Sequence, residues 1–182
     1  MAEEEQNGAE AGAAAQGQDG EAPAQQFALE RVYLKDLSFE SPSSPAVFRK
    51  DYKPAVNVDL RTRSTQVQPE HYEVVVTITV TATMDDETAF LVEVQQAGIF
   101  MARGLEGEGL RQVLSIFCPN MLFPYAREVI DNTVVRGTFP ALMLSQVNFE
   151  ALYAQAVQQA QQQAGEQGDA AAPAPESGEA AS

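Results

Sequence analysis

The chain holds few side chains that could carry catalytic chemistry. Its one histidine is His71, and its one cysteine, Cys118, stands just before Pro119 at the expected start of a helix, where the helix dipole could lower the pKa of the thiol. A cysteine nucleophile needs a base, and His71 is the only imidazole available. A metal site of familiar spacing needs more histidines or cysteines. We therefore expect a structural or surface role for His71, an unreactive, partly buried thiol at Cys118 and no bound metal.

Adjacent carboxylates offer a second possible chemistry. Asp85, Asp86 and Glu87 are consecutive in a short polar segment between two strand-like stretches. General acid–base catalysis needs two carboxyl groups that face one substrate, whereas acids in a hairpin turn are normally solvated. We expect a turn here, and a small oligomeric enzyme with carboxylate chemistry stays open only as an alternative without positive support.

Three glycines between residues 104 and 109 are spaced superficially like a phosphate-binding loop. The acidic residues between them would repel phosphate, and no lysine, serine or threonine follows at the required place. We expect a flexible linker or lid. Because no motif requires a cofactor, none is expected, and an interaction protein is the stronger class.

Charge is concentrated at the two ends. The 182 residues include 26 acidic and 11 basic ones, for a net charge of −15. Residues 1–26 hold six acids and 164–182 hold four, with no base in either, and large apolar residues are scarce in both. We expect two disordered acidic tails around one folded domain at 27–163. This balance disfavours nucleic acid and anionic membrane surfaces and favours basic partners.

Location follows from equally simple features. One cysteine cannot close an internal disulfide, and the acidic start lacks the basic and apolar regions of a secretory signal. No apolar run approaches the roughly 18 residues of a membrane-spanning helix. We expect a soluble, cytoplasmic protein that does not insert into a membrane.

Alternating apolar and polar residues predict four strands. They cover 27–40, 56–63, 71–83 and 88–100, and the last two form a hairpin. In the second strand, Val56, Val58 and Leu60 share one side, which is typical of a half-buried strand. Residues 46–54 carry aromatics between prolines and indicate a long, exposed crossover.

Helical spacing begins after the fourth strand. It runs through Leu110–Phe117, and Pro119 then stands where helices favour a first-turn proline. Arg136 and Gly137 suit a helix end, and Asn148 suits the cap of a last helix. Strands followed by helices predict an α+β fold, with two helices on one face of a four-stranded antiparallel sheet. The other face of the sheet must be solvated or meet a partner. A four-stranded sheet with two helices is too small to enclose a substrate pocket by itself, which favours an oligomer.

Four segments carry a resemblance to a known family. RVYLKDLSFESP, TAFLVEVQQAGIF, FCPNMLFPYARE and RGTFPALMLSQVNFEALY, in this order, resemble the SecB family of protein-export chaperones over about residues 27–160. The resemblance implies a homotetramer built as a dimer of dimers. It implies a protein that holds unfolded secretory precursors in the cytoplasm, delivers them to the ATPase SecA and catalyses nothing itself.

The resemblance also implies a client-binding groove between the crossover and the last helix. Its positions fall on Val47, Phe48, Tyr52, Phe149, Leu152 and Tyr153. Tyr52 stands where the family often has Trp, so we expect weaker anchoring of clients there. The alternative for all six residues is that they pack the loop onto the helix.

The resemblance also implies a SecA-binding site and a subunit interface. The SecA-binding positions fall on Asp36, Glu40, Leu91 and Glu93, and the subunit-interface positions fall on Val92, Val94 and Gln96. Alternation independently puts Asp36 with Glu40 on one face, and Leu91 with Glu93 on one face. This acidic patch would attract the basic, zinc-bearing tail of SecA, so the zinc would belong to the partner.

A SecB-like chaperone dedicated to a toxin–antitoxin pair is the nearest alternative. Such a protein needs the client groove but not the SecA patch. The presence of Asp36, Glu40, Leu91 and Glu93 favours protein export.

Overall fold

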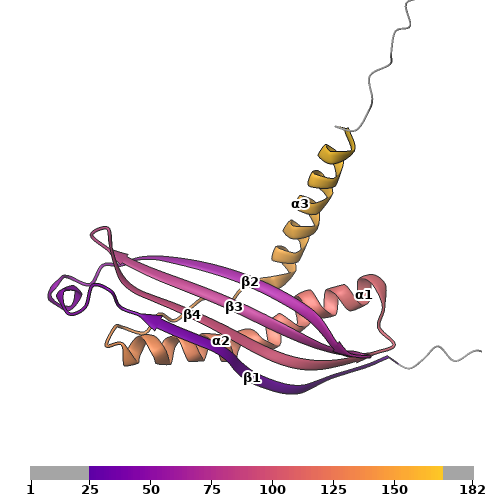
Figure 1. Cartoon of the computed structure of the whole chain (residues 1–182), viewed down its shortest axis with the longest axis horizontal. Coiled ribbons are helices and arrows are strands. Elements are labelled where there is room, and N and C mark those ends of the chain that lie inside the picture. The colour runs from indigo at the N-terminus through magenta and orange to yellow at the C-terminus, as the bar shows by residue number, and fades with distance from the viewer. Residues whose placement is uncertain (1–24, 170–182) are drawn as a thin grey trace, which may run out of the picture.

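The computed structural model describes residues 25–169, and its centre is one antiparallel sheet (Figure 1). The strands lie in the order β1-β4-β3-β2. Their bounds are Gln26–Glu40 for β1, Ala55–Gln68 for β2, His71–Met84 for β3 and Glu87–Arg103 for β4. All four predicted strands are confirmed. Strand β2 continues five residues past its predicted end.

The β3–β4 hairpin forms the middle of the sheet. Asp85 and Asp86 make its turn with φ angles of 50° and 63°, the left-handed conformation that two-residue hairpin turns require. Lys50 Nζ lies 2.8 Å from Glu87 Oε2 and 3.7 Å from Asp85 Oδ2. The predicted turn is confirmed, and these carboxylates tie the crossover to the hairpin.

A single continuous helix follows the sheet. It consists of α1 (Gly107–Gln112), the π-helical turn η2 (Val113–Phe117) and α2 (Cys118–Arg136). The predicted helix start at Cys118 is where α2 begins, but it is not a free helix end, because η2 runs directly into it. Pro119 lacks an N–H and removes one donor from the helical ladder, and the backbone bonding changes from α to π in the turn just before it. The expected linker at 104–109 is also shorter than predicted, because the helix begins at Gly107.

The core lies between α2 and the two central strands. An i, i+4 stripe of α2 is fully buried against the inner face of β3 and β4. Its members are Leu122, Ala126, Ile130 and Val134. Each larger apolar side chain buried here contributes roughly 1.5–3 kcal/mol relative to exposure. The sheet and this helix therefore hold each other in place.

Strand β2 is more exposed than the predicted half-buried strand. Val56 and Val58 are 44% and 45% exposed, and almost every residue of the strand is exposed. The reason is the layer above it: α2 covers β4 and β3, whereas β2 is reached by η2. An apolar strip on the inner face of the sheet edge is left open.

The last helix, α3 (Phe149–Asp169), points away from the sheet (Figure 1). Asn148 Oδ1 accepts a hydrogen bond from the Ala151 N–H at 3.0 Å, which confirms the predicted cap. Residues 154–162 are exposed, so the helix meets the rest of the protein through its first two turns. The α+β class with two helices is confirmed.

Residues outside the described range include most of the predicted tails. The N-terminal tail at 1–26 and the C-terminal tail at 164–182 fall largely outside residues 25–169, and their disorder stays a prediction. Helix α3 continues to Asp169, past the predicted domain end at 163. Within 25–169, no helix has both the length and the apolar character needed to cross a membrane.

Candidate functional site

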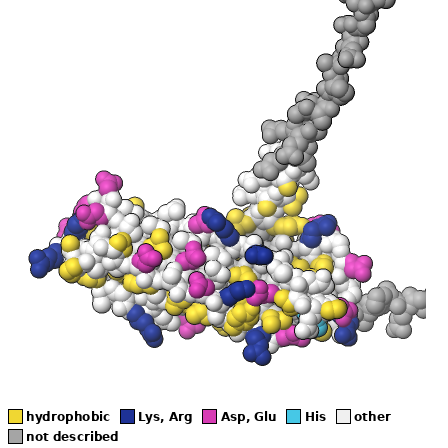
Figure 2. All heavy atoms as spheres, in the orientation of Figure 1, with side chains coloured by type: hydrophobic (Ala, Val, Ile, Leu, Met, Phe, Trp, Pro, Cys, Tyr) yellow, Lys and Arg dark blue, Asp and Glu magenta, His cyan; other side chains and the backbone are white. Residues whose placement is uncertain are grey.

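An apolar groove lies beside the open strip of β2. Its cavity has a volume of about 600 Å³. The lining comes from Val56, Val58 and Leu60 of β2, Phe123 of α2, residues 142–147 and Leu152 of α3. No charged side chain belongs to this lining. Figure 2 shows hydrophobic side chains gathered where α3 leaves the body. Such a groove can accept apolar side chains of many shapes.

The connection from α2 to α3 forms one wall of this groove. Gly137 ends α2 where a Cβ would lie 2.4 Å from the Phe39 ring, so any other residue would have to displace that ring. The Met143 N–H donates a hydrogen bond to Asp131 Oδ1 at 3.0 Å. This bond ties an irregular segment to α2, while the Met143 side chain stays 75% exposed. A flexible thioether at the rim suits varied apolar ligands.

The crossover residues of the predicted groove gather around Phe139. The Phe48 and Tyr52 rings lie with centroids 5.2 and 6.4 Å from that of Phe139, which packs on Phe90 in turn. Phe48 is 49% exposed and Tyr52 is 39% exposed, so both offer surface. Val47 is buried and offers none, because it anchors the crossover in the core.

The three α3 residues have different surroundings. Phe149 is buried edge-on against Phe123, with ring centroids 6.0 Å apart. Leu152 is 41% exposed and lines the groove. Tyr153 borders an adjoining hollow of about 370 Å³. The loop-packing alternative thus describes Val47 and Phe149, and the other four predicted residues stay accessible.

Sequence reasoning missed the floor and one wall of the groove. The alternation in β2 correctly predicts that Val56, Val58 and Leu60 share a face. It predicts that this face is buried, whereas in the structure it forms the floor of the groove. Residues 142–147 form no regular element, so no periodicity marks them. The structure places the two exposed crossover aromatics and the α3 residues against different parts of the 139–149 segment.

The predicted SecA-binding residues come together on the outer face, opposite α2. The register pairs Glu40 with Leu91, and Glu93 with Ser38, so neighbouring positions of β1 and β4 point the same way. Asp36 pairs with Gln95 in the same row. Each pair shares a face, as alternation predicted, and the register brings the two pairs together as one patch. Their role in binding SecA stays a prediction.

A further acidic residue of this face, Glu73, is paired with a positive charge. Lys35 Nζ lies 2.8 Å from both oxygens of Glu73, and the Tyr33 hydroxyl donates to Glu73 Oε1. The hydrogen bond from Lys35 is the main reason that the pKa of Glu73 is lowered. The bond to Glu73 raises the pKa of Tyr33 to about 12. Figure 2 shows acidic and basic side chains interspersed over the visible face of the sheet.

The predicted subunit-interface residues lie on the inner face, toward α2. Val92 and Val94 are fully buried, and Gln96 is 3% exposed with its Nε2 donating to Tyr33 O at 2.8 Å. Their orientation toward the helices is as predicted. Their side chains cannot touch a second copy directly, so any effect on assembly must pass through α2.

Neither Cys118 nor His71 is placed for catalysis, and Cys118 is more deeply buried than predicted. Cys118 is fully buried, and burial raises the pKa of its thiol to about 12. His71 Nδ1 lies 2.8 Å from Pro69 O and its Nε2 lies 3.3 Å from Glu30 Oε1. Both residues therefore serve local packing or strand-end contacts.

Comparisons with known proteins agree with this architecture. A family model described as preprotein translocase subunit SecB matches residues 20–160. Protein-export protein SecB of Hahella chejuensis is 60% identical over 150 residues, covering 81% of this chain and 94% of that protein. Its counterpart in Pseudomonas savastanoi pv. phaseolicola is 59% identical over 141 residues, covering 78% and 86%.

The fold is also similar to a solved structure. A SecB-like chaperone of Mycobacterium tuberculosis, in complex with a peptide of an antitoxin, superposes with a TM-score of 0.54. It is 16% identical and covers 66% of this chain and 87% of that chain. At this identity the likeness concerns the fold. The family match and the two relatives lead to one conclusion: this chain belongs to the SecB family of protein-export proteins.

Proposed function

We propose that the protein is a cytoplasmic chaperone that binds unfolded precursor proteins, keeps them competent for translocation and delivers them to SecA. The observation that carries the proposal is the open, uncharged groove beside β2, formed by side chains that a monomeric protein ordinarily buries. Family membership supports the same role. Holding an unfolded chain requires no reaction, so the protein acts by binding alone.

The energetics suit a holder of many sequences. Burying on the order of 1,000 Å² of apolar client surface contributes roughly 25 kcal/mol before costs. Ordering a flexible chain removes much of this gain. Strand β2 is also a sheet edge, whose free backbone groups can pair with an extended client without reading its sequence. Several grooves in one assembly raise the affinity by avidity.

The assembly we propose is a homotetramer arranged as a dimer of dimers. Its support is a row of exposed apolar residues on the long helix, at i, i+4 and i+8. Phe117, Met121 and Tyr125 are 61%, 39% and 47% exposed. Helices in contact across a subunit boundary bury such a row.

Delivery to SecA uses the outer face of the sheet. We assign the contact to the patch of Asp36, Glu40, Leu91 and Glu93, which combines one apolar side chain with three acids. A basic tail of SecA complements this charge. The client groove lies on the inner side of the sheet, so both partners can bind at once.

Native mass spectrometry tests the proposal. The purified chain is measured alone and after mixing with a urea-denatured secretory precursor, and the folded precursor serves as the control. We expect a tetramer that retains the unfolded precursor and ignores the folded form. A monomer or dimer that captures neither would overturn the proposal.

A toxin–antitoxin chaperone is the second candidate. The Mycobacterium tuberculosis protein of similar fold was solved with an antitoxin peptide, which favours this alternative. The acidic outer patch favours export instead. Binding of SecA to the wild type, and its loss on reversing the charge of Glu93, separates the two functions. The enzyme alternative gains nothing from Asp85 and Glu87, which pair with Lys50.

A further inference from the structure

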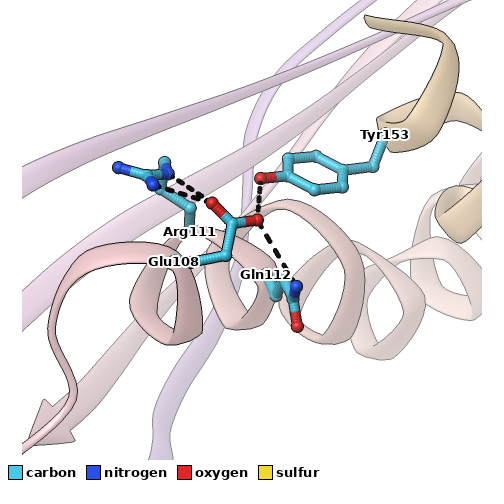
Figure 3. Close-up of polar contacts among 4 residues, drawn as sticks. All are labelled: Glu108, Arg111, Gln112 and Tyr153. Atoms are coloured by element: carbon cyan, nitrogen blue, oxygen red, sulfur yellow. Dashed lines mark hydrogen bonds and ion pairs between the residues drawn. The ribbon is translucent and has the colours of Figure 1, made fainter. Parts of the chain in front are cut away.

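A polar cluster joins α3 to α1, the start of the continuous helix formed by α1, η2 and α2. The Tyr153 hydroxyl donates a hydrogen bond to Glu108 Oε1 at 2.7 Å, although the two residues are 45 positions apart (Figure 3). Glu108 belongs to the first turn of α1, and Tyr153 belongs to the second turn of α3. This bond links α3, which lines the hollow next to the groove, to α1, which leads directly into the turn η2 that contributes Ser115 to the same hollow.

The carboxylate of Glu108 is held in place by its own helix. Arg111 donates to Glu108 Oε2 from Nε at 2.9 Å and from Nη2 at 2.7 Å. Gln112 Nε2 lies 3.4 Å from Oε1, the same oxygen that Tyr153 reaches (Figure 3). These i, i+3 and i, i+4 partners orient the acceptor independently of α3. Hydrogen bonds from Tyr153 and Arg111 lower the pKa of Glu108, so the carboxylate stays charged near neutral pH.

Two anchors on one face fix the direction of α3. Phe149 is buried against Phe123 at the start of the helix, and Tyr153 follows four residues later, about 6 Å along the axis. A helix held only at Phe149 could swing about that point. The second anchor at Tyr153 removes this freedom, and residues 154–162 beyond it are exposed.

We propose that Glu108 is a positioning residue, which holds Tyr153 and thereby fixes α3 as a wall of the client groove. Leu152 lies between the two anchors and lines both the groove and the adjoining hollow, which share Leu60 as well. A fixed α3 therefore presents Leu152 to a client in one position. The inference rests on the proposed function for its consequence in client binding, but not for the geometry of α3.

Distances between spin labels test the geometry without any client. Labels are placed at Thr65→Cys on β2 and Gln158→Cys on α3, and labelled protein is diluted into unlabelled protein so that pairs lie within one chain. Cys118 is buried and needs no replacement. We expect a narrow distance distribution in the parent. We expect Tyr153→Phe and Glu108→Ala to broaden it equally, and the double variant to broaden it no further.

Matched controls separate the bond from general effects. Tyr72→Phe removes the hydroxyl of a tyrosine that lies outside both the groove lining and the exposed row, and Glu106→Ala removes a neighbouring acid, so both should keep the narrow distribution. Glu108→Gln retains an acceptor oxygen and should restore most of the order. An unchanged distribution in Tyr153→Phe, or a Glu108→Gln variant as broad as Glu108→Ala, would overturn the positioning role.

Affinity for a urea-denatured precursor tests the consequence. We expect Tyr153→Phe and Glu108→Ala to weaken capture about threefold and both controls to leave it unchanged. Broader distances with unchanged affinity would overturn the link between α3 and client binding. A wild type that captures no precursor would overturn the proposed function, while the label distances would still decide the role of Glu108.

Discussion

The Thr79 hydroxyl donates a hydrogen bond to Glu93 Oε2 at 2.9 Å, across the two central strands of the outer face. This neutral donor orients the carboxylate and leaves its charge intact. Glu73 lies on the same face but is paired with Lys35. Two glutamates of one sheet face therefore differ in how much negative charge they offer to a partner.

This difference predicts the effect of neutralising each glutamate. Glu93→Gln should weaken binding to SecA about three- to tenfold at low salt and reduce the salt dependence, because a rim charge mainly steers association. Glu73→Gln is the matched control and should change binding less than twofold. Titration at two salt concentrations measures both. Equal losses in the two variants would contradict the proposed limits of the patch.

The floor of the groove predicts a loss of client affinity on a nearly isosteric change. Val58→Thr replaces an exposed methyl group by a hydroxyl and should weaken precursor capture about two- to fivefold. Val67→Thr is the control, since Val67 is 49% exposed on the same strand but lies outside the cavity lining. The free energy of unfolding of both variants should lie within about 0.5 kcal/mol of the wild-type value. Equal capture by all three proteins would contradict the groove assignment.

Burial of Cys118 predicts an unreactive thiol. With its pKa raised to about 12, the native thiol should react with an aromatic disulfide reagent at pH 8 about a thousandfold more slowly than the urea-unfolded chain. Absorbance of the released thiolate follows both rates. Rapid labelling of the native protein would mean that the helix around Cys118 opens readily.

The single imidazole predicts a measurable dependence of stability on pH. Its hydrogen bond to Pro69, together with Glu30, raises the pKa of His71 above 6.5. Folding therefore favours the protonated form, so this contribution is complete below the unfolded pKa and is lost as pH rises through the folded pKa. NMR titration reports the native and urea-unfolded values. Glu30→Gln should lower the native pKa, and Glu40→Gln should not; a native value at or below 6.5 would contradict the contact.

A charge at Val94 should weaken the tetramer indirectly. Val94 is fully buried beneath α2, so Val94→Asp should cost the protomer about 3 kcal/mol or more and shift the helix that carries the exposed row. Leu91→Asp places the same charge on the outer face and is the control. Native mass spectrometry compares the two. An unchanged native mass for folded Val94→Asp would count against the interface.

Much of the sheet was predictable because its signals are local. Alternation in residues 71–83 fixed both the strand and its faces, and Asn148 marked a helix start by its side-chain chemistry. The same alternation could not show whether a layer covers β2, because burial depends on where α2 lies. For Val56 and Val58 the face was correct and its environment was wrong.

Other features depend on contacts between distant segments. Pro119 resembles a first-turn proline, and only the path of the backbone shows that η2 carries the helix through it. The bond between Glu108 and Tyr153 joins residues whose spacing has no regular period. The direction of α3 therefore could not be deduced from its own sequence, although its existence could.

The uncharged lining of the groove has a thermal consequence. Burial of apolar surface carries a negative heat-capacity change and loses strength on cooling, whereas attraction to the acidic outer patch responds to ionic strength. If the proposed assignments hold, temperature and salt act on different faces of the sheet. We then expect cooling to weaken client binding in the groove, and added salt to weaken SecA binding at the outer patch while the client remains bound.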